Sequence, residues 1–339
     1  MLYQKSHFGV VVNNSSQIVS IFDTDTLKAL QHIPLNADVI DVALNRDCSR
    51  AVVSSFDSKT MFQIDLSGKY ATVIGSATAD TFLEDIALTP DGRYALSVDG
   101  AIENQDIVSY SLRDNAYVST LPANAQAVAV SPKGNGLVLT AVEDSKSVHR
   151  YTVNRYGILI DTGQEFPAGP GPININFSRD GNFAFISSFA YSGVSVLSTI
   201  LPDQITLIST DDTFASQSMA VSRDDRHLFA LGQDIVSIYH FDPVAGSLSF
   251  ERSFEHGLQI KPYFGVEQIA LDPSGTRLFI SALGQIAVFT TYGTKLGTVE
   301  EVSGPGGLAI CHCHKLYPYT PYHPHRTTWF DLLRLNALR

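Results

Sequence analysis

Residues 86–99 read IALTPDGRYALSVD. Two short apolar runs flank a Pro-Asp-Gly turn, which is a strong signal for a β-hairpin. The same order of apolar strand, polar turn and apolar strand recurs in VALNRDCSRAVVSS (42–55), VAVSPKGNGLVLTA (128–141), INFSRDGNFAFISS (175–188), MAVSRDDRHLFALG (219–232) and IALDPSGTRLFISA (269–282). The sequence therefore predicts an internal repeat built from β-hairpins.

The period of this repeat indicates its architecture. The turns are marked by Asp47, Asp91, Lys133, Asp180, Asp224 and Ser274, at spacings of 44, 42, 47, 44 and 50 residues. One four-stranded propeller blade takes about 40–45 residues. A third strand such as IVSYSL (107–112) and a fourth such as AYVSTL (116–121) follow each hairpin. β-Branched and aromatic residues dominate these runs, and helical spacing is absent.

The two ends of the chain complement each other. FGVVVNN (8–14), QIVSIFD (17–23) and KALQHIPL (28–35) match the second, third and fourth strands of the repeat, so the first blade lacks a first strand. GPGGLAIC (304–311) matches a first strand with nothing after it. We predict an all-β, seven-bladed β-propeller of four-stranded antiparallel blades over residues 1–314, in which a C-terminal strand at 307–311 joins the N-terminal blade. Residues 315–339 are expected to form a proline-rich linker and a short C-terminal helix or disordered tail.

The repeat resembles a known one. VVVNNSSQIVSIFDTDTLKALQHIPL (10–35) resembles the YVTN repeat, in which Tyr-Val-Thr-Asn, a short loop and Val-Ser-Val-Ile-Asp follow one another. SPKG (131–134), TPDGRYAL (89–96) and DPSGTRLF (272–279) resemble the Ser-Pro-Asp-Gly turn of that repeat. The resemblance covers roughly residues 8–311 and implies a propeller of the superfamily that includes lactonases. It implies no single activity, because such propellers host unrelated roles.

Composition limits the partners and the compartment. The 339 residues carry a net charge of −11 without a Lys/Arg cluster, so neither nucleic acid nor an anionic membrane is an expected partner. No apolar run approaches the length of a membrane span. The three cysteines, Cys48, Cys311 and Cys313, are odd in number and do not suggest a disulfide framework. No basic and apolar leader precedes the first strand, so a cytoplasmic location is expected.

A candidate site follows from aligning the first strands, which line the central channel of a propeller. The position near the channel mouth is occupied in successive blades by Asp41, Asp85, Ala127, Asn174, Ser218, Gln268 and Gly307. Two residues later six of the seven blades have alanine, and Asn176 is the exception. We expect a ligand at Asp41, Asp85, Asn174, Ser218 and Gln268. The loops between second and third strands favour a cation or an amine there, because they carry Asp57, Asp99, Glu103, Asp106, Glu143 and Asp144. The alternative is that each aspartate binds loop amides of its own blade.

The motifs leave three functional interpretations open. A binding or scaffold propeller leads, with a small molecule or a protein at the channel mouth, because no nucleophile elbow, Walker loop, zinc-protease motif or dinucleotide fingerprint occurs. A lactonase-type hydrolase or isomerase is the alternative. However, SSFDSKT (54–60) and SSFAYSG (187–193) lack the His and Arg that lactonase propellers carry after the second strand. A metal-assisted lyase at the acidic mouth is the third.

Neither a cofactor nor a metal centre is indicated. In ICHCHK (310–315) the cysteines and histidines alternate. On a strand they would face opposite sides, so these four alone could not converge on one ion, although His323 and His325 could add donors if the tail folds back.

Overall fold

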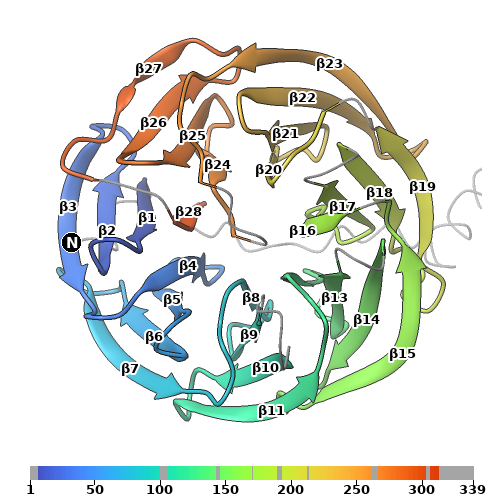
Figure 1. Cartoon of the computed structure of the whole chain (residues 1–339), viewed down its shortest axis with the longest axis horizontal. Helices are drawn as coiled ribbons and strands as arrows, with labels where there is room; N and C mark the ends of the chain where they lie inside the picture. Colours follow the sequence, from blue (N-terminus) through green and yellow to red (C-terminus); the bar gives the residue numbers. More distant parts are fainter. Residues whose placement is uncertain are drawn as a thin grey trace, which may run out of the picture.

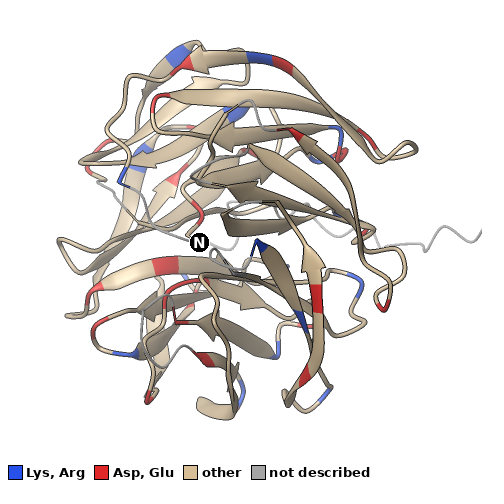
Figure 2. Ribbon diagram, turned by 45° about the vertical axis from the view of Figure 1, so that its right-hand side comes forward, with Lys and Arg blue, Asp and Glu red and all other residues tan. Residues whose placement is uncertain are grey.

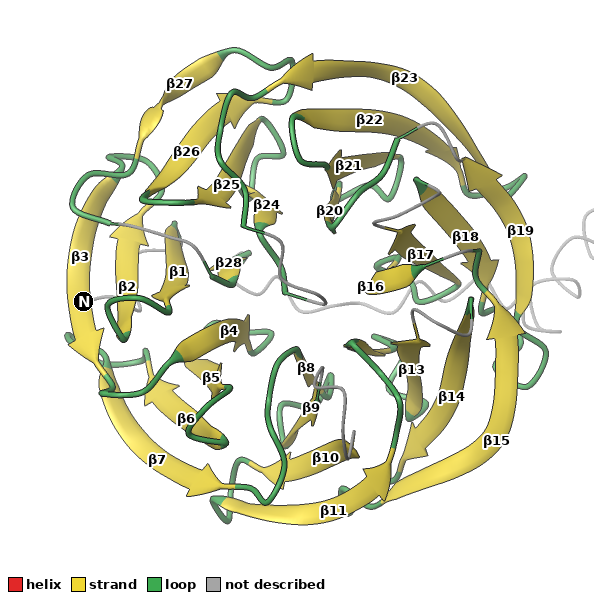
Figure 3. Ribbon diagram, viewed as in Figure 1, coloured by secondary structure: helices red, strands yellow, loops and turns green. Residues whose placement is uncertain are grey.

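The computed structural model describes residues 7–99, 106–142, 146–169, 171–188, 193–211, 214–261, 266–302 and 306–312. This part of the chain forms seven four-stranded antiparallel sheets that stand around a common axis, so the predicted propeller is confirmed (Figure 1). All regular elements of the described residues are strands (Figure 3). Within the same residues, no helix has the length and apolarity to cross a membrane.

Each blade has an innermost, a second, a third and an outer strand. The innermost strands are β28 (Leu308–Ile310), β4 (Val39–Leu44), β8 (Ile86–Leu88), β12 (Ala127–Val130), β16 (Pro172–Phe177), β20 (Ser218–Val221) and β24 (Ile269–Leu271). The second strands are β1 (Phe8–Asn13), β5 (Arg50–Ser55), β9 (Tyr94–Val98), β13 (Leu137–Val142), β17 (Phe183–Ser188), β21 (His227–Leu231) and β25 (Arg277–Ala282). We number the blades 1 to 7 in this order.

The remaining two strands complete each blade outward. The third strands are β2 (Ile18–Asp23), β6 (Thr60–Asp65), β10 (Asp106–Ser111), β14 (Ser147–Val153), β18 (Val194–Ser198), β22 (Ile235–Asp242) and β26 (Gln285–Thr290). The outer strands are β3 (Lys28–Pro34), β7 (Thr72–Thr78), β11 (Ala116–Pro122), β15 (Leu159–Pro167), β19 (Thr206–Asp211), β23 (Ser247–Glu255) and β27 (Lys295–Thr298). The innermost strands begin at one face of the ring, which we call the mouth face.

Burial explains why these sequences form blades. The second strand of blade 1, β1, is buried at every position because both of its faces pack against neighbouring blades. The outer strand β7 is exposed or half-exposed throughout, since one face meets solvent. Apolar clusters fill the seams between blades, as where Phe22 of blade 1 contacts Phe279 of blade 7 at 5.8 Å between ring centroids.

The closing strand is where the sequence predicted it. β28 pairs antiparallel with β1, with Val10 opposite Ala309, so the last described strand completes the first blade. The backbone N–H of Val12 donates to the carbonyl of Gly307 at 3.0 Å, and the N–H of Cys311 donates to Phe8 at 2.9 Å. This pairing leaves neither end of the repeat as an open sheet edge.

The turn between the first two strands of the repeat needs a positive φ at one position. Four blades place glycine there, namely Gly92, Gly134, Gly181 and Gly275, with φ between 66° and 71°. Blades 2 and 6 place Cys48 and Asp225 at this position, with φ of 55° and 57°. A residue with a Cβ is strained in this region, so these two side chains call for a separate explanation.

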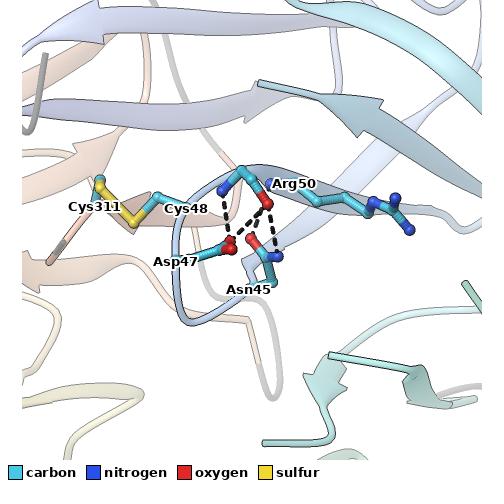
Figure 4. Close-up of a disulfide and its surroundings, with 6 residues drawn as sticks. Asn45, Asp47, Cys48, Arg50 and Cys311 are labelled. Atoms are coloured by element: carbon cyan, nitrogen blue, oxygen red, sulfur yellow. Dashed lines mark hydrogen bonds between the residues drawn. A yellow bond between two sulfur atoms is a disulfide. The ribbon is translucent and has the colours of Figure 1, made fainter. Parts of the chain in front are cut away.

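Cys48 forms a disulfide with Cys311, so the expectation that the cysteines provide no disulfide is wrong for this pair. The two Cα atoms are 5.8 Å apart although 263 residues separate them in the sequence (Figure 4). Ring closure brings the turn of blade 2 beside the end of β28, and no local sequence pattern records that proximity. The expectations for Glu103, Glu143, Asp144, Cys313, His314 and the tail 315–339 lie outside the described residues.

Candidate functional site at the mouth face

Asp41 and Asp85 join the innermost strands of neighbouring blades. Asp41 lies on β4 and is 1% exposed, and its Oδ2 accepts the backbone N–H of Ile86 in blade 3 at 3.1 Å. Asp85 precedes β8 and is 4% exposed, and its Oδ2 accepts the N–H of Val128 in blade 4 at 2.6 Å. Each carboxylate thus binds the next blade, and Asp41 also accepts a hydrogen bond from the backbone of Val42 in its own blade, as the sequence-based alternative expects.

Glu267 reaches the same face from blade 7, immediately before Gln268. Its Oε1 accepts the side-chain amides of Asn174 at 3.2 Å and Asn176 at 2.8 Å, both from β16. Its Oε2 accepts the hydroxyl of Ser218 in blade 6 at 3.1 Å. One carboxylate therefore links blades 5, 6 and 7; the carboxyl group is buried, whereas the residue as a whole keeps partial exposure.

The remaining predicted residue, Gln268, belongs to the same network. Its backbone N–H donates to the Ser218 hydroxyl at 2.9 Å. Its side chain accepts from Gln217 at 3.1 Å and donates to the carbonyl of Lys261 at 2.9 Å. The structure thus brings Asn174, Ser218 and Gln268 together through Glu267 and its neighbours, and it places Asp41 beside Asp85. Their role in ligand binding stays a prediction.

The carboxyl groups at the mouth face hold protons more tightly than usual. Burial raises the pKa of Asp41 to about 6, and burial with the nearby Asp41 charge raises the pKa of Asp85 well above its ordinary value. Burial raises the pKa of Glu267 to about 7, against the lowering effect of the asparagine amides. Burial and the charges of Asp99 and Asp41 raise the pKa of Glu84 to about 8. At neutral pH some of these carboxyl groups are therefore protonated while others are ionised.

Basic partners do not neutralise this cluster within the described part of the chain. No ion pair between described residues includes Asp41, Asp85, Glu84 or Glu267. Lys and Arg are dispersed over the ribbon among acidic residues, as Figure 2 shows. The described residues also contain no group of three or more His, Cys, Asp or Glu side chains that could hold a metal ion.

Sequence reasoning missed Glu267, Asn176 and Glu84. A signal existed for Asn176, since it replaces the alanine found in the other blades, and its amide binds Glu267. Glu267 adjoins the aligned position but lies outside β24, in a connection whose course no repeat pattern fixes. Of the predicted loop carboxylates, Asp99 accepts the Thr81 hydroxyl at 2.6 Å, and a carboxyl contact with Asp38 raises the pKa of Asp57.

Comparison with known proteins places the fold among propellers of several kinds. A periplasmic gluconolactonase from Pseudomonas aeruginosa superposes with a TM-score of 0.72 at 18% identity, over 90% of this chain and 99% of that one. A candidate 6-phosphogluconolactonase from Bacteroides fragilis gives 0.70 at 16% identity, over 91% and 98%. At such identities the likeness concerns the fold alone. No protein-family model matches the chain, and no curated protein matches it in sequence.

One solved structure is much more similar in sequence. It is a functionally unknown protein from Desulfotomaculum acetoxidans, with a TM-score of 0.88 and 37% identity over 91% of this chain and 100% of that chain. Identity at this level over a whole chain reflects common descent as well as a common fold. The chain described here therefore belongs to the same family of seven-bladed β-propellers as the Desulfotomaculum acetoxidans protein.

Proposed function

We propose that the protein binds a small polar ligand at the mouth face, through Glu267 and the polar side chains around it. The observation that carries the proposal is the convergence of Asp41, Asp85 and Glu267 from three different blades, with no ion pair to a described basic residue. A ligand with hydrogen-bond donors or a positive charge would relieve the crowding of these carboxyl groups. The net charge of −11 favours the approach of such a ligand.

Glu267 is the residue through which we expect the ligand to be recognised. It is the partly exposed member of the cluster, whereas Asp41 and Asp85 are buried beneath the ring of strand ends. Asn174 and Asn176 hold its carboxylate in place, so little side-chain freedom is lost on binding. The competing explanation is that all three carboxylates serve only to join blades.

Ligand-induced stabilisation separates these explanations. Melting of the full chain is followed with δ-gluconolactone, gluconate, spermidine and Ca²⁺, each at several concentrations. A ligand that binds the folded state raises the melting temperature in a concentration-dependent way. The proposal expects a shift in the wild type that Glu267→Gln abolishes. Asp91→Asn is the matched control, because it removes one charge from a turn at the opposite face and should leave the shift intact.

Either of two outcomes would refute binding at the mouth. One is that no compound in the panel raises the melting temperature of the wild type. The other is that a ligand raises the melting temperature of Glu267→Gln as much as that of the wild type, since the ligand would then bind elsewhere.

A lactonase-type reaction is the second candidate. Two observations favour it: lactonases share the fold, and the pKa of Glu267 near 7 suits a general base at neutral pH. We also propose that the repeat is of the YVTN type, on the evidence of residues 10–35. The catalytic residues of other propellers are not carried over, because the corresponding loops lack their His and Arg. Acid release from δ-gluconolactone, compared between wild type and Glu267→Gln, tests this activity; equal rates would exclude Glu267 as the base.

A further inference from the structure

The closing strand connects the mouth face to the disulfide within five residues. At the mouth face, the N–H of Gly307 donates to the carbonyl of Ile40 at 2.8 Å, and the N–H of Leu308 donates to the carbonyl of Glu267 at 2.7 Å. At the other end, Cys311 is bonded to Cys48 in the turn of blade 2. A shift of β28 therefore acts directly on the backbone of Glu267 and on the residue preceding Asp41.

The non-covalent closure is short. Only three residue pairs join β28 to β1: Gly9 with Ile310, Val10 with Ala309, and Val11 with Leu308. The apolar side chains of Leu308 and Ile310 add burial in the seam with blade 7. In blades 2, 4, 5 and 6 the first two strands are joined by four or five pairs, and in blades 3 and 7 by three, but there a turn of the chain also connects the two strands.

Cys48 stands where the repeat uses glycine. Its φ of 55° is unfavourable for a residue with a Cβ, and four other blades avoid the strain with glycine. The strain is retained at the one turn whose side chain reaches the closing strand. This coincidence indicates that the cysteine is present for the covalent bond rather than for the turn.

We propose that the Cys48–Cys311 disulfide is a redox latch that fixes β28 and, through β28, the geometry of the mouth face. The consequence for ligand binding rests on the proposed function, whereas the latch itself does not. Cys48 is 5% and Cys311 1% exposed, so a dithiol reductant would reach the bond when the seam opens locally, and would then open it by thiolate attack on one sulfur, followed by displacement from the mixed disulfide. Cys48 and Cys311 each take up a proton and together two electrons, and the dithiol becomes a disulfide.

Reduction should loosen the seam without unfolding the ring. The three pairs of β28 would then fray, and the bond from Leu308 to Glu267 would open more often. Blades 4 and 5 lie across the ring from this seam (Figure 1) and should not respond. This pattern distinguishes a latch from a general loss of stability, which would affect all blades together.

Hydrogen exchange of the full chain, read by mass spectrometry, tests the latch without any ligand. In the reduced protein, exchange should become at least tenfold faster in peptides that contain residues 306–311, 8–13 and 266–271. Peptides from β13 and β17 should keep their rates. Cys311→Ser should reproduce the effect without reductant, and Cys313→Ser should leave the oxidised pattern unchanged.

Cys48→Gly is the decisive variant, because it removes the bond and supplies the residue that the turn prefers. If it also exchanges faster at 306–311, the covalent bond and not the turn holds the strand. Equal protection of 306–311 in oxidised, reduced and Cys311→Ser protein would overturn the latch. Faster exchange at 306–311 with unchanged exchange at 266–271 would overturn its coupling to the mouth. A failed ligand screen would bear on the proposed function alone.

Discussion

Both carboxylate oxygens of Asp225 lie within hydrogen-bond distance of the backbone N–H of Arg179, at 2.9 and 3.0 Å, across the seam between blades 6 and 5. Asp225 occupies the same positive-φ turn position as Cys48, which reaches across another seam to Cys311. In the other four turns glycine fills this position. The repeat thus departs from glycine at two turns, and at both the added side chain is bonded to an adjacent blade.

This relationship predicts how substitutions at Asp225 will rank in stability. Asp225→Ala loses the hydrogen bond and keeps the strained φ, whereas Asp225→Gly loses the bond and relieves the strain. The glycine variant should be more stable than the alanine variant by about 1 kcal/mol, since a left-handed residue with a Cβ costs about 1–2 kcal/mol. Urea unfolding of the two variants measures the difference. An alanine variant as stable as the glycine variant would contradict the assignment of strain.

A second prediction concerns the bridge from Asp41 to blade 3. Asp41→Ala leaves the buried N–H of Ile86 without an acceptor, which should cost about 1–3 kcal/mol. Asp41→Asn keeps an acceptor and removes the buried charge, so it should be much less destabilising at pH 8. Chemical denaturation at this pH compares the three proteins. Equal losses for alanine and asparagine would mean that the charge itself matters.

The raised pKa values at the mouth face predict a decline in stability with rising pH. A Glu whose pKa is raised in the folded state stabilises the fold fully below its ordinary pKa near 4.3, and this contribution is lost as the pH rises through the folded-state value. For Glu267 that value is about 7, and for Glu84 about 8. The melting temperature should therefore fall between about pH 5 and pH 8.

Two matched variants check the origin of this decline. Glu267→Gln and Glu84→Gln should each flatten the curve in this window. Asp91→Asn should not, because hydrogen bonds from Thr89 and Arg93 lower the pKa of Asp91 despite its partial burial, and its contribution is lost only at acidic pH. A wild-type melting temperature that is constant over this window would refute the assignment.

The backbone at Gly307 leaves no room for a side chain. A Cβ there would lie 2.1 Å from Oδ1 and 2.7 Å from Cα of Asp41, and backbone atoms cannot yield as a flexible side chain can. Gly307→Ala should therefore lower the free energy of unfolding by about 1–3 kcal/mol. Gly297→Ala is the control, since its Cβ would meet only Leu27 at 3.8 Å. Calorimetric melting of both variants tests this contrast. Similar losses of stability in the two variants would contradict the close approach of Asp41 to Gly307.

The disulfide also makes the cellular compartment testable. Disulfides persist in oxidising compartments and are rare in the reducing cytoplasm, so we predict that the bond is formed in the cell only if the protein resides outside the reducing cytoplasm. If so, Cys48 and Cys311 in the native source should resist alkylation until a reductant is added. Rapid acid quenching and mass spectrometry of tryptic peptides measure this. Complete alkylation without reductant would support the cytoplasmic expectation instead.

The fold could be predicted because its determinants are local and repeated. Strand runs, turns such as Asp91-Gly92 and a spacing of 42–50 residues each carry information within one blade, and seven copies reinforce one another. Even the closing strand followed from the missing first strand of blade 1. The alignment that grouped the strand-start residues rests on the same repetition, and their role as a site stays a prediction.

The missed features depend on proximity between distant residues. The sequence offers no local reason for Cys48 to meet Cys311, and the one available clue was a cysteine at a glycine position. Glu267 was missed because it stands two residues before β24, where the alignment stops being informative. The bond from Asp41 to Ile86 was not predicted, because a hydrogen bond to the next blade depends on how blades pack, which the pattern within one blade does not encode.

The disulfide also determines where a pulling force would travel. Residues 48 to 311 form a closed covalent circle, and both chain ends leave from its junction. Tension applied to the two ends would unravel β1 to β4 and then stop at the sulfur–sulfur bond. Most of blade 2 and all of blades 3 to 7 would carry no load. A single backbone cut anywhere inside the circle would likewise release no fragment, so a nicked molecule would retain its full mass until it is reduced.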